Sequence, residues 1–283
     1  MPAARMAEIV ASAQGRGCGI GAFNLIGIEH AEAIVAGAEA AGLPVVLQIS
    51  ENCVRYHGAI EPIALAALAI GRAAAVPVAV HLDHATAPDL VETAVGLGIG
   101  SVMFDASGFD YSANLAATAD LTRWCHARGI WVEAELGEIG GKNGVHAPGV
   151  RTRPEDAAAY VAATGVDALA VAVGTSHAML SRDALLDFDL IGQIRARVPA
   201  AVPLVLHGSS GVPDDGLGKA IMAGMTKINI ATQLNKVFTA AVRERLTADP
   251  RLVDPRKYGA AGRDAVAAEV TRLLRMLDAA GVP

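Results

Sequence analysis

The chain has 283 residues, of which 53% are hydrophobic and 18% charged, and its formal net charge is −6. This length suits one large α/β barrel or two small domains, and the apolar share suits the thick core that an all-parallel sheet needs. The negative charge excludes a broad basic surface, so nucleic acid is not an expected partner. An anionic substrate would have to be held by local groups.

The remaining composition indicates a cytoplasmic protein. Cys18, Cys53 and Cys125 are far apart and lack zinc-finger spacing, which is typical of reduced thiols. The first residues lack the apolar run of a signal peptide, and no uninterrupted apolar stretch has membrane-spanning length. We therefore expect a soluble chain with no membrane partner.

In chain order, short apolar runs alternate with Ala-rich stretches of helical periodicity. The expected strands are Ile20–Asn24, Val45–Ser50, Val78–His84, Ser101–Ser107, Ile130–Leu136, Ala168–Gly174, Leu204–Gly208 and Lys227–Thr232. The helices expected between them include Glu29–Ala41, Pro62–Ala75, Pro88–Leu97, Ala113–Arg128 and Pro154–Thr164. Four prolines fall where a proline suits the first turn of a helix, namely Pro62, Pro88, Pro154 and Pro213.

This alternation predicts an α/β fold, a (β/α)8 TIM barrel, in one domain covering residues 1–283. We expect an extra N-terminal helix over Pro2–Gln14 and further C-terminal helices after Arg251. A doubly wound open sheet is the alternative.

Most polar residues of the expected strands fall at their C-terminal ends, where barrel enzymes place their chemistry. His84, His177 and His207 end three different strands, and three imidazoles with one open position form a catalytic zinc site. Any one of them alone would be read as a capping or core histidine. His81, inside its strand, is expected to be buried against a helix.

Asp83 lies beside the proposed metal and is the expected acid/base, although it could instead orient a histidine. Neighbouring strand residues face opposite sides, so Asp83 and His84 can both reach the barrel mouth only if the strand is irregular there.

Two loops suit a phosphate group, because backbone N–H groups, hydroxyls and a helix N-terminus bind anions without a cationic side chain. Gly208–Gly211 follows the seventh expected strand, and Asn229–Thr232 leads from the eighth into a helix. Barrels often hold phosphate at these loops. Ordinary turn and cap chemistry would explain either loop alone.

At these residues the sequence resembles the class II fructose-bisphosphate and tagatose-bisphosphate aldolases. The resemblance runs over nearly the whole chain, in the motifs Ala22–Asn24, His81–His84, Glu133–Gly137 with Gly140–Gly141, Val173–His177, Leu206–Ser210, Asn229–Thr232 and Asp254–Tyr258.

The resemblance implies reversible cleavage of a fructose- or tagatose-type ketose 1,6-bisphosphate, or a related ketose phosphate, to dihydroxyacetone phosphate and an aldehyde. One Zn²⁺ on His84, His177 and His207 would polarise the ketone, and Asp83 would move a proton at the hydroxyl. Asp105 and Glu135 would support the metal or form an alternate position for it.

The resemblance further implies a monovalent cation as a second cofactor and a homodimer or homotetramer. The phosphate of dihydroxyacetone phosphate would lie on Gly208, Ser209 and Ser210 and on Asn229, Ile230, Ala231 and Thr232. Asn24 and Ser50 would contact the substrate, and Arg256, from the same or a neighbouring subunit, would meet the far phosphate.

Two departures put the standard substrate in doubt. Ala178 follows the second zinc histidine, where family members usually have Gly against the phosphate. Asn143 stands at about the place of a Glu that moves the proton at the nucleophilic carbon. His146, the nearest titratable side chain, becomes the candidate replacement base.

The sequence offers three alternative functions. A Schiff-base aldolase needs a lysine facing the mouth, whereas Lys227 is expected to open its strand at the opposite end. A zinc hydrolase barrel usually has His-x-His on its first strand, which Ile20–Asn24 lacks. A non-catalytic or otherwise repurposed sugar-phosphate-binding barrel would keep the phosphate loops but would need neither Asp83 nor the histidines.

Overall fold

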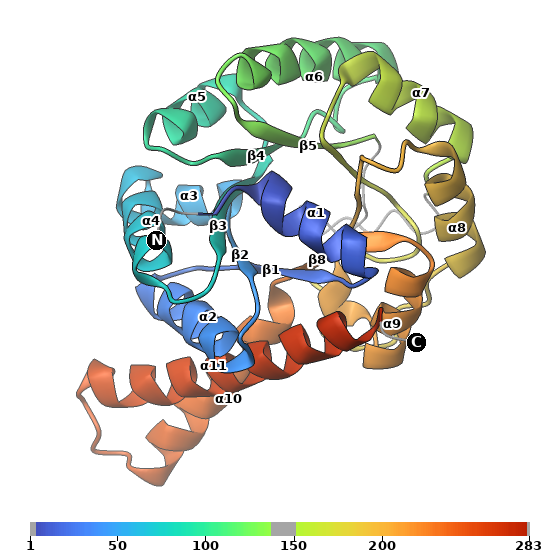
Figure 1. The fold of residues 1–283 in the computed structure, drawn as a ribbon. Helices are drawn as coiled ribbons and strands as arrows, with labels where there is room; N and C mark the ends of the chain where they lie inside the picture. Colours follow the sequence, from blue (N-terminus) through green and yellow to red (C-terminus); the bar gives the residue numbers. More distant parts are fainter. Residues whose placement is uncertain (1–3, 137–150, 282–283) are drawn as a thin grey trace.

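The computed structural model describes residues 4–136 and 151–281. Eight parallel strands form a closed barrel in which each strand pairs with the next and β8 pairs with β1 (Figure 1). The strands are β1 Ile20–Asn24, β2 Val45–Ser50, β3 Val78–Ala85, β4 Ser101–Phe104, β5 Trp131–Glu135, β6 Ala168–Ala170, β7 Leu204–Leu206 and β8 Met225–Ile230.

Helices surround the barrel as in the predicted (β/α)8 fold (Figure 1). They are α1 Met6–Arg16, α2 Ile28–Ala41, α3 Glu51–His57, α4 Glu61–Ala73, α5 Pro88–Gly96, α6 Tyr111–His126, α7 Pro154–Thr164, α8 Phe188–Arg197, α9 Asp214–Met222, α10 Thr232–Ala248 and α11 Pro255–Ala279. The barrel prediction is confirmed, and the open sheet is wrong.

Proline placement at helix starts is mostly confirmed. Pro62, Pro88 and Pro154 lie in the first turns of α4, α5 and α7, where the missing N–H costs nothing. Pro213 instead precedes α9 as its N-cap residue, so that expectation was one position off.

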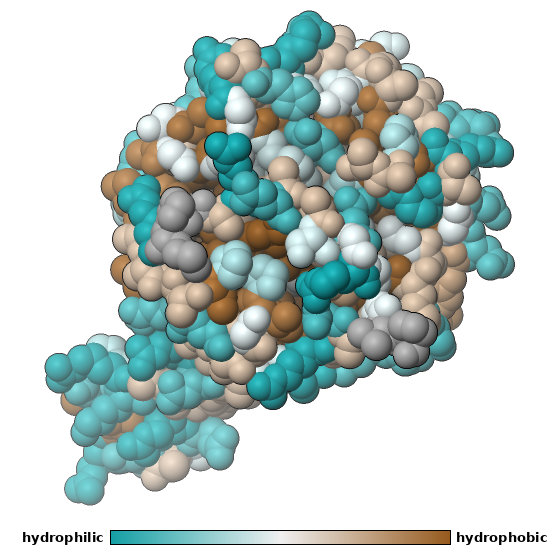
Figure 2. All heavy atoms as spheres, in the orientation of Figure 1, coloured by the Kyte–Doolittle hydropathy of each residue, from teal (hydrophilic) through white to brown (hydrophobic). Residues whose placement is uncertain are grey.

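The barrel interior has an apolar end and a polar end. Helix α1 covers the apolar end, at the N-terminal ends of the strands, as Figure 1 shows. The buried cluster there joins the inner faces of three strands to α1 and comprises Met6, Ile9, Val10, Ala13, Cys18, Ile20, Ala22, Val46 and Ala79. Figure 2 views the molecule from this side, with hydrophobic residues visible around α1 and mainly hydrophilic ones on the projecting parts of α10 and α11.

At the polar end of the barrel, two residues lie elsewhere than the sequence predicted. Lys227 is the third residue of β8, wholly buried, and its Nζ lies 2.9 Å from Glu133 Oε2. It therefore does not open the strand as expected. His81 is also wholly buried but lies beside Glu133 and Ser101 on neighbouring strands, with its Nδ1 2.6 Å from Ser101 Oγ, so it faces the barrel interior rather than a helix.

Among the described residues no single helix is both long and apolar enough to cross a membrane. Helices α3 and α4 meet such a test only jointly, by length and composition, and a bend of 117° separates them.

Candidate active site

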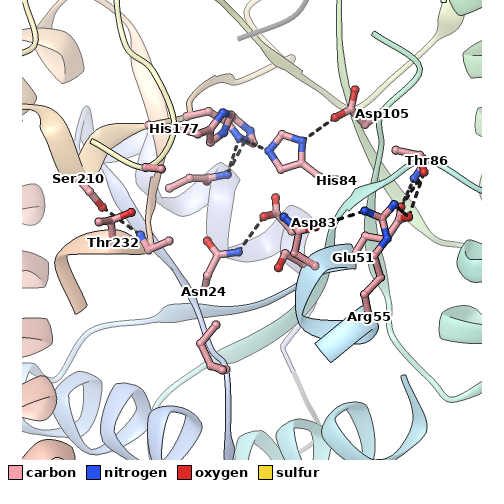
Figure 3. Close-up of a pocket in the computed structure, with 18 residues that line it drawn as sticks. Asn24, Glu51, Arg55, Asp83, His84, Thr86, Asp105, His177, Ser210 and Thr232 are labelled. Carbon is pink, nitrogen blue, oxygen red and sulfur yellow. Dashed lines mark hydrogen bonds and ion pairs between the residues drawn. The ribbon is translucent and has the colours of Figure 1, made fainter. Parts of the chain in front are cut away.

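A cavity of about 340 Å³ opens at the C-terminal ends of the strands. Figure 3 shows side chains from several strands converging on it. The predicted residues that line it are Asn24, Ser50, Asp83, His84, Asp105, His177, Ala178, His207, Gly208, Ser210, Asn229, Ala231 and Thr232.

Four of the predicted residues that the structure describes do not line this cavity. Ser209 is buried, and its hydroxyl donates to the Leu206 carbonyl at 2.9 Å, while Ile230 is buried in the apolar core. Glu135 is buried and can share an ion with His84 and Asp105. Arg256 lies at the start of α11 with its side chain 89% exposed.

The three histidines come together as predicted. One ring nitrogen of each of His84, His177 and His207 lies within 4.8 Å of the corresponding atoms of the other two. The ring centroids are 4.7 Å apart for His84 and His207, 5.0 Å for His84 and His177, and 5.7 Å for His177 and His207. Rings at these separations leave room for one small ion among them.

In two of these histidines, the ring nitrogen that points away from the cluster contacts a carboxylate. His84 Nδ1 lies 2.7 Å from Asp105 Oδ2, and His207 Nε2 lies 2.9 Å from Glu133 Oε1. The other nitrogens, His84 Nε2 and His207 Nδ1, face each other at 2.9 Å. Histidines that bind metals usually donate their second N–H to such an acceptor, which fixes the ring and its tautomer.

Glu133 was not among the predicted site residues. It accepts from His207 through one oxygen and pairs with Lys227 through the other. The signal was present, because Glu133 and Glu135 alternate on β5 and so face the same side of the sheet. Burial, and after it the neighbouring His84, holds the pKa of His207 well below its usual value, which favours the neutral imidazole that metals require.

An irregular backbone at His84 brings two adjacent residues to the same cavity. His84 has a φ of 51°, in the left-handed region, and the pairing of β3 with β4 shifts register between Leu82 and Ala85. A regular strand would send Asp83 and His84 to opposite faces. The turn at His84 is the irregularity that the sequence required, and both side chains line the cavity.

A chain of amides orients Asp83. Gln48 Nε2 donates to Asn24 Oδ1 at 3.1 Å, and Asn24 Nδ2 donates to Asp83 Oδ2 at 2.8 Å. Asp83 Oδ1 is buried and has no hydrogen-bond partner among the described residues. One oxygen is thus held by protein, while the other remains for a ligand.

The pKa of Asp83 is lowered although the residue is buried. Burial alone would raise this pKa, but His84, His207, Lys227 and the hydrogen bond from Asn24 together outweigh it. The carboxylate form therefore prevails at neutral pH.

The two loops predicted to bind phosphate, Gly208–Gly211 and Asn229–Thr232 (the phosphate-type loops), meet beside the histidines. The Ser210 hydroxyl accepts from the Ala231 N–H at 3.2 Å and from the Gln233 N–H at 3.1 Å. It thereby supplies α10 with the cap that its own N-cap residue, Ala231, lacks. Gly208 is needed between β7 and Ser210, because its φ is 67° and a Cβ there would lie 2.5 Å from the Ser176 carbonyl oxygen.

Ala178 adopts a left-handed backbone conformation that glycine tolerates more readily. Its φ is 58°, which costs a residue with a side chain about 1 kcal/mol. Relative to glycine, the alanine at this position adds a methyl group beside the cavity. The other departure, Asn143, and the candidate base His146 lie outside the described residues.

Comparisons with known proteins identify the family of this chain. The family model for class II fructose-bisphosphate aldolase matches residues 4–282. The chain belongs to this family. It is 38% identical over 266 residues to a fructose-bisphosphate aldolase of Geobacillus stearothermophilus, covering 93% of this chain and 92% of that protein. A fructose-bisphosphate aldolase of Thermus caldophilus is 36% identical over 301 residues, covering 97% of each chain.

Solved structures confirm the fold. The YdjI aldolase from Escherichia coli K12 matches with a TM-score of 0.86 at 30% identity, covering 97% of each chain. A putative fructose-1,6-bisphosphate aldolase from Coccidioides immitis matches with a TM-score of 0.88 at 29% identity, covering 99% of this chain and 98% of the other. As a class II aldolase, the chain is a lyase of carbohydrate metabolism.

Five further residues that the sequence had not singled out line the cavity. Four of them lie on or beside α3 and β3 and comprise Glu51, Asn52, Arg55 and Thr86, and the fifth is Ile26 after β1. The residues following Ser50 have the pattern of an ordinary helix start, so nothing local in the sequence marked them.

Proposed function

We propose that this aldolase is zinc-dependent and reversibly cleaves a fructose- or tagatose-type ketose 1,6-bisphosphate to dihydroxyacetone phosphate and an aldehyde. One observation carries the proposal: the histidine cluster, the partly unpartnered Asp83 carboxylate and the two phosphate-type loops surround a single cavity. Each of these features alone could have an ordinary structural role, whereas zinc-dependent aldol cleavage of a ketose phosphate requires all three in one cavity.

The residues present fit a zinc ion. Imidazole nitrogens of His84, His177 and His207 are close enough to share one ion, and Asp105 and Glu133 anchor two of the rings. Three neutral imidazoles with an open position are a catalytic zinc set. Bound there, zinc would act as a Lewis acid on the substrate ketone. The binding of a monovalent cation as a second cofactor stays a prediction.

The chain's own groups account for the proton at the substrate hydroxyl. Asp83 is ionised, oriented through Asn24, and has Oδ1 turned to no protein donor among the described residues. We propose that this oxygen accepts the hydroxyl proton as the carbon–carbon bond breaks and returns it in the reverse direction. A protein that only bound sugar phosphates would leave a buried, partly unpartnered carboxylate without use.

The phosphate of dihydroxyacetone phosphate is assigned to the joined loops at Ser210 and Thr232. Ser210 holds the start of α10, where the helix N-terminus and backbone N–H groups favour an anion. Ala178 lies against the same cavity, so its methyl group borders this region.

A Schiff-base mechanism would have to use Lys227, the buried lysine inside the barrel. Its Nζ is fully buried, pairs with Glu133 and donates to Asn229 Oδ1 at 2.9 Å. These contacts occupy the amino group, whereas a Schiff base requires it to be free to attack the substrate carbonyl.

The direct test uses protein freed of metal with a chelator and then restored with zinc. Fructose 1,6-bisphosphate and tagatose 1,6-bisphosphate are supplied, and dihydroxyacetone phosphate and aldehyde are measured. We expect release only after zinc is restored. Full activity of the metal-free protein, or inactivation by borohydride in the presence of substrate, would refute the zinc mechanism.

We infer that the enzyme is cytoplasmic and assembles as a homodimer or homotetramer. Arg256 supports assembly, because its side chain is 89% exposed, pairs with Asp254 and does not line its own chain's cavity. Its predicted contact with the far phosphate would therefore need another copy. Sedimentation analysis of wild type tests the assembly, and the activity of Arg256→Ala tests the contact of Arg256 with the far phosphate.

A further inference from the structure

The cavity has a second polar rim, opposite the phosphate-type loops. In Figure 3, Ser210 and Thr232 lie on one side of Asp83 and His84, and Glu51, Arg55 and Thr86 lie on the other. A molecule that passes from the loops across the proposed reacting centre therefore ends near Arg55.

Glu51 is fixed in place by the neighbouring strand end. One carboxylate oxygen accepts from the Thr86 N–H at 2.6 Å and from the Thr86 hydroxyl at 2.9 Å, and the side chain is only 13% exposed. These bonds tie the first residue of α3 to the segment after β3. Arg55 lies one helical turn further along α3 and donates from Nη2 to the same carboxylate.

Arg55 keeps capacity for another acceptor. Its guanidinium has five N–H donors, of which the described residues engage Nη2, with Glu51, and Nη1, with Asn52 Oδ1 at 3.4 Å. The side chain is 61% exposed. An ion pair this exposed contributes at most about 1 kcal/mol, so structural support alone is a weak reason for its position.

The charge balance of the cavity points to the same residue. Among the described residues that line it, Arg55 is the one arginine or lysine, whereas Glu51, Asp83 and Asp105 are acidic. The loops around Ser210 can hold one phosphate with backbone groups, whereas among the described residues the opposite rim carries the acidic Glu51, which disfavours a second anion. An anion there needs a cationic partner, and the planar guanidinium fits phosphate or carboxylate oxygens.

We propose that Arg55 binds the terminal anionic group, phosphate or carboxylate, on the aldehyde half of the substrate and so selects aldehydes that carry such a group. This inference rests on the proposed aldolase function and names a specificity residue within the chain's own cavity. Arg256, which is expected to meet the same far phosphate, would have to come from another copy.

The test measures condensation of dihydroxyacetone phosphate with three aldehydes: glyceraldehyde 3-phosphate, succinic semialdehyde and uncharged glyceraldehyde. The variants are Arg55→Met and Arg55→Lys. The matched control is Arg123→Met, which removes an arginine of similar exposure, 70%, from a helical ion pair with Asp120 on α6.

For wild type, we expect a higher kcat/KM with a charged aldehyde than with glyceraldehyde, and the preferred charged aldehyde identifies phosphate or carboxylate. Arg55→Met should lower that preference about tenfold to hundredfold, the usual effect of losing a charged hydrogen bond. Arg55→Lys should retain part of it, and Arg123→Met should retain all of it.

Two failures are distinguishable. If wild type condenses dihydroxyacetone phosphate with none of the aldehydes, the aldolase function proposed above falls, and this inference falls with it. If wild type is active but Arg55→Met lowers kcat/KM equally for charged and uncharged aldehydes, the aldolase function stands and the role of Arg55 is refuted.

Discussion

The two ends of the barrel are built from the same strands but bury different side chains. At the end under α1, the strands contribute Ile20, Ala22, Val46 and Ala79 to an apolar cluster. At the other end, the same strands continue into Asn24, Gln48 and Asp83 and their hydrogen-bond chain. Apolar burial stabilises the first end, whereas buried charges at the second cost free energy unless they are paired. The comparison separates a stabilising half from a reactive half.

The largest effect should come from the metal cluster in the reactive half. His207→Ala removes a nitrogen that is proposed to bind zinc. It also removes the ring N–H that donates to Glu133. We expect activity to be lost and zinc content, measured by atomic absorption, to fall sharply. Normal zinc content with normal activity would remove His207 from the metal site.

The buried pair at the boundary between the halves should affect stability next most strongly. Lys227→Met leaves Glu133 buried with one oxygen unpaired, which costs roughly 3–5 kcal/mol. Urea unfolding of the metal-free protein measures this, because bound metal would add its own stabilisation. Adding Glu133→Gln should recover part of the loss. A single variant as stable as wild type would show that the pair is not stabilising.

Asp83→Asn tests the reactive half without removing a metal ligand. The amide cannot accept the proton but keeps the shape that Asn24 contacts. We expect kcat to fall about 10²-fold or more while zinc content stays normal. If zinc is lost while the metal-loaded fraction keeps its kcat, Asp83 instead orients the metal site.

Ser210→Ala should have a smaller effect at the phosphate loops. It removes the hydroxyl that accepts from the Ala231 and Gln233 N–H groups. We expect binding of dihydroxyacetone phosphate to weaken about tenfold, and more than that of unphosphorylated dihydroxyacetone, as measured by calorimetry. Thr232→Val should show the same preference. Equal losses for both ligands would place the phosphate elsewhere.

The smallest effect should come from the apolar end. Ile9→Val in α1 removes one buried methylene group and should lower stability by about 1 kcal/mol, measured as the shift in Tm. Activity at temperatures below the transition should not change, because Ile9 lies at the opposite end from the cavity. A marked fall in kcat would show that the two halves are coupled.

Sequence patterns located the elements better than their ends. Helix Pro154–Thr164 was predicted to the residue because proline opens it and a left-handed Gly165 ends it. Several strands were predicted too long at their C-terminal ends, with β6 ending at Ala170 rather than Gly174. The chain there leaves its neighbours to form loops, so the pairing ends although the residues remain apolar.

The site was predictable where strand alternation dictated it. The three histidines and the phosphate loops follow from strand ends meeting at one barrel face. Strand alternation also required an irregular backbone at His84, but its left-handed form was not predictable, because that form accompanies a register shift with β4. Arg55 was missed for a different reason: its place at the rim comes from Glu51 bonding to Thr86, 35 residues away in sequence.

The closure of the barrel also has a consequence for how the chain is made. Strand β1 pairs with β8, with Ile20 opposite Lys227, so roughly 200 residues separate two neighbouring strands. At about 5–20 residues per second, a ribosome needs on the order of 10–40 s to make that length. Throughout this interval β1 has an open edge, and open edges pair with other chains. Nascent chains of this protein should therefore depend on chaperones most until β8 emerges.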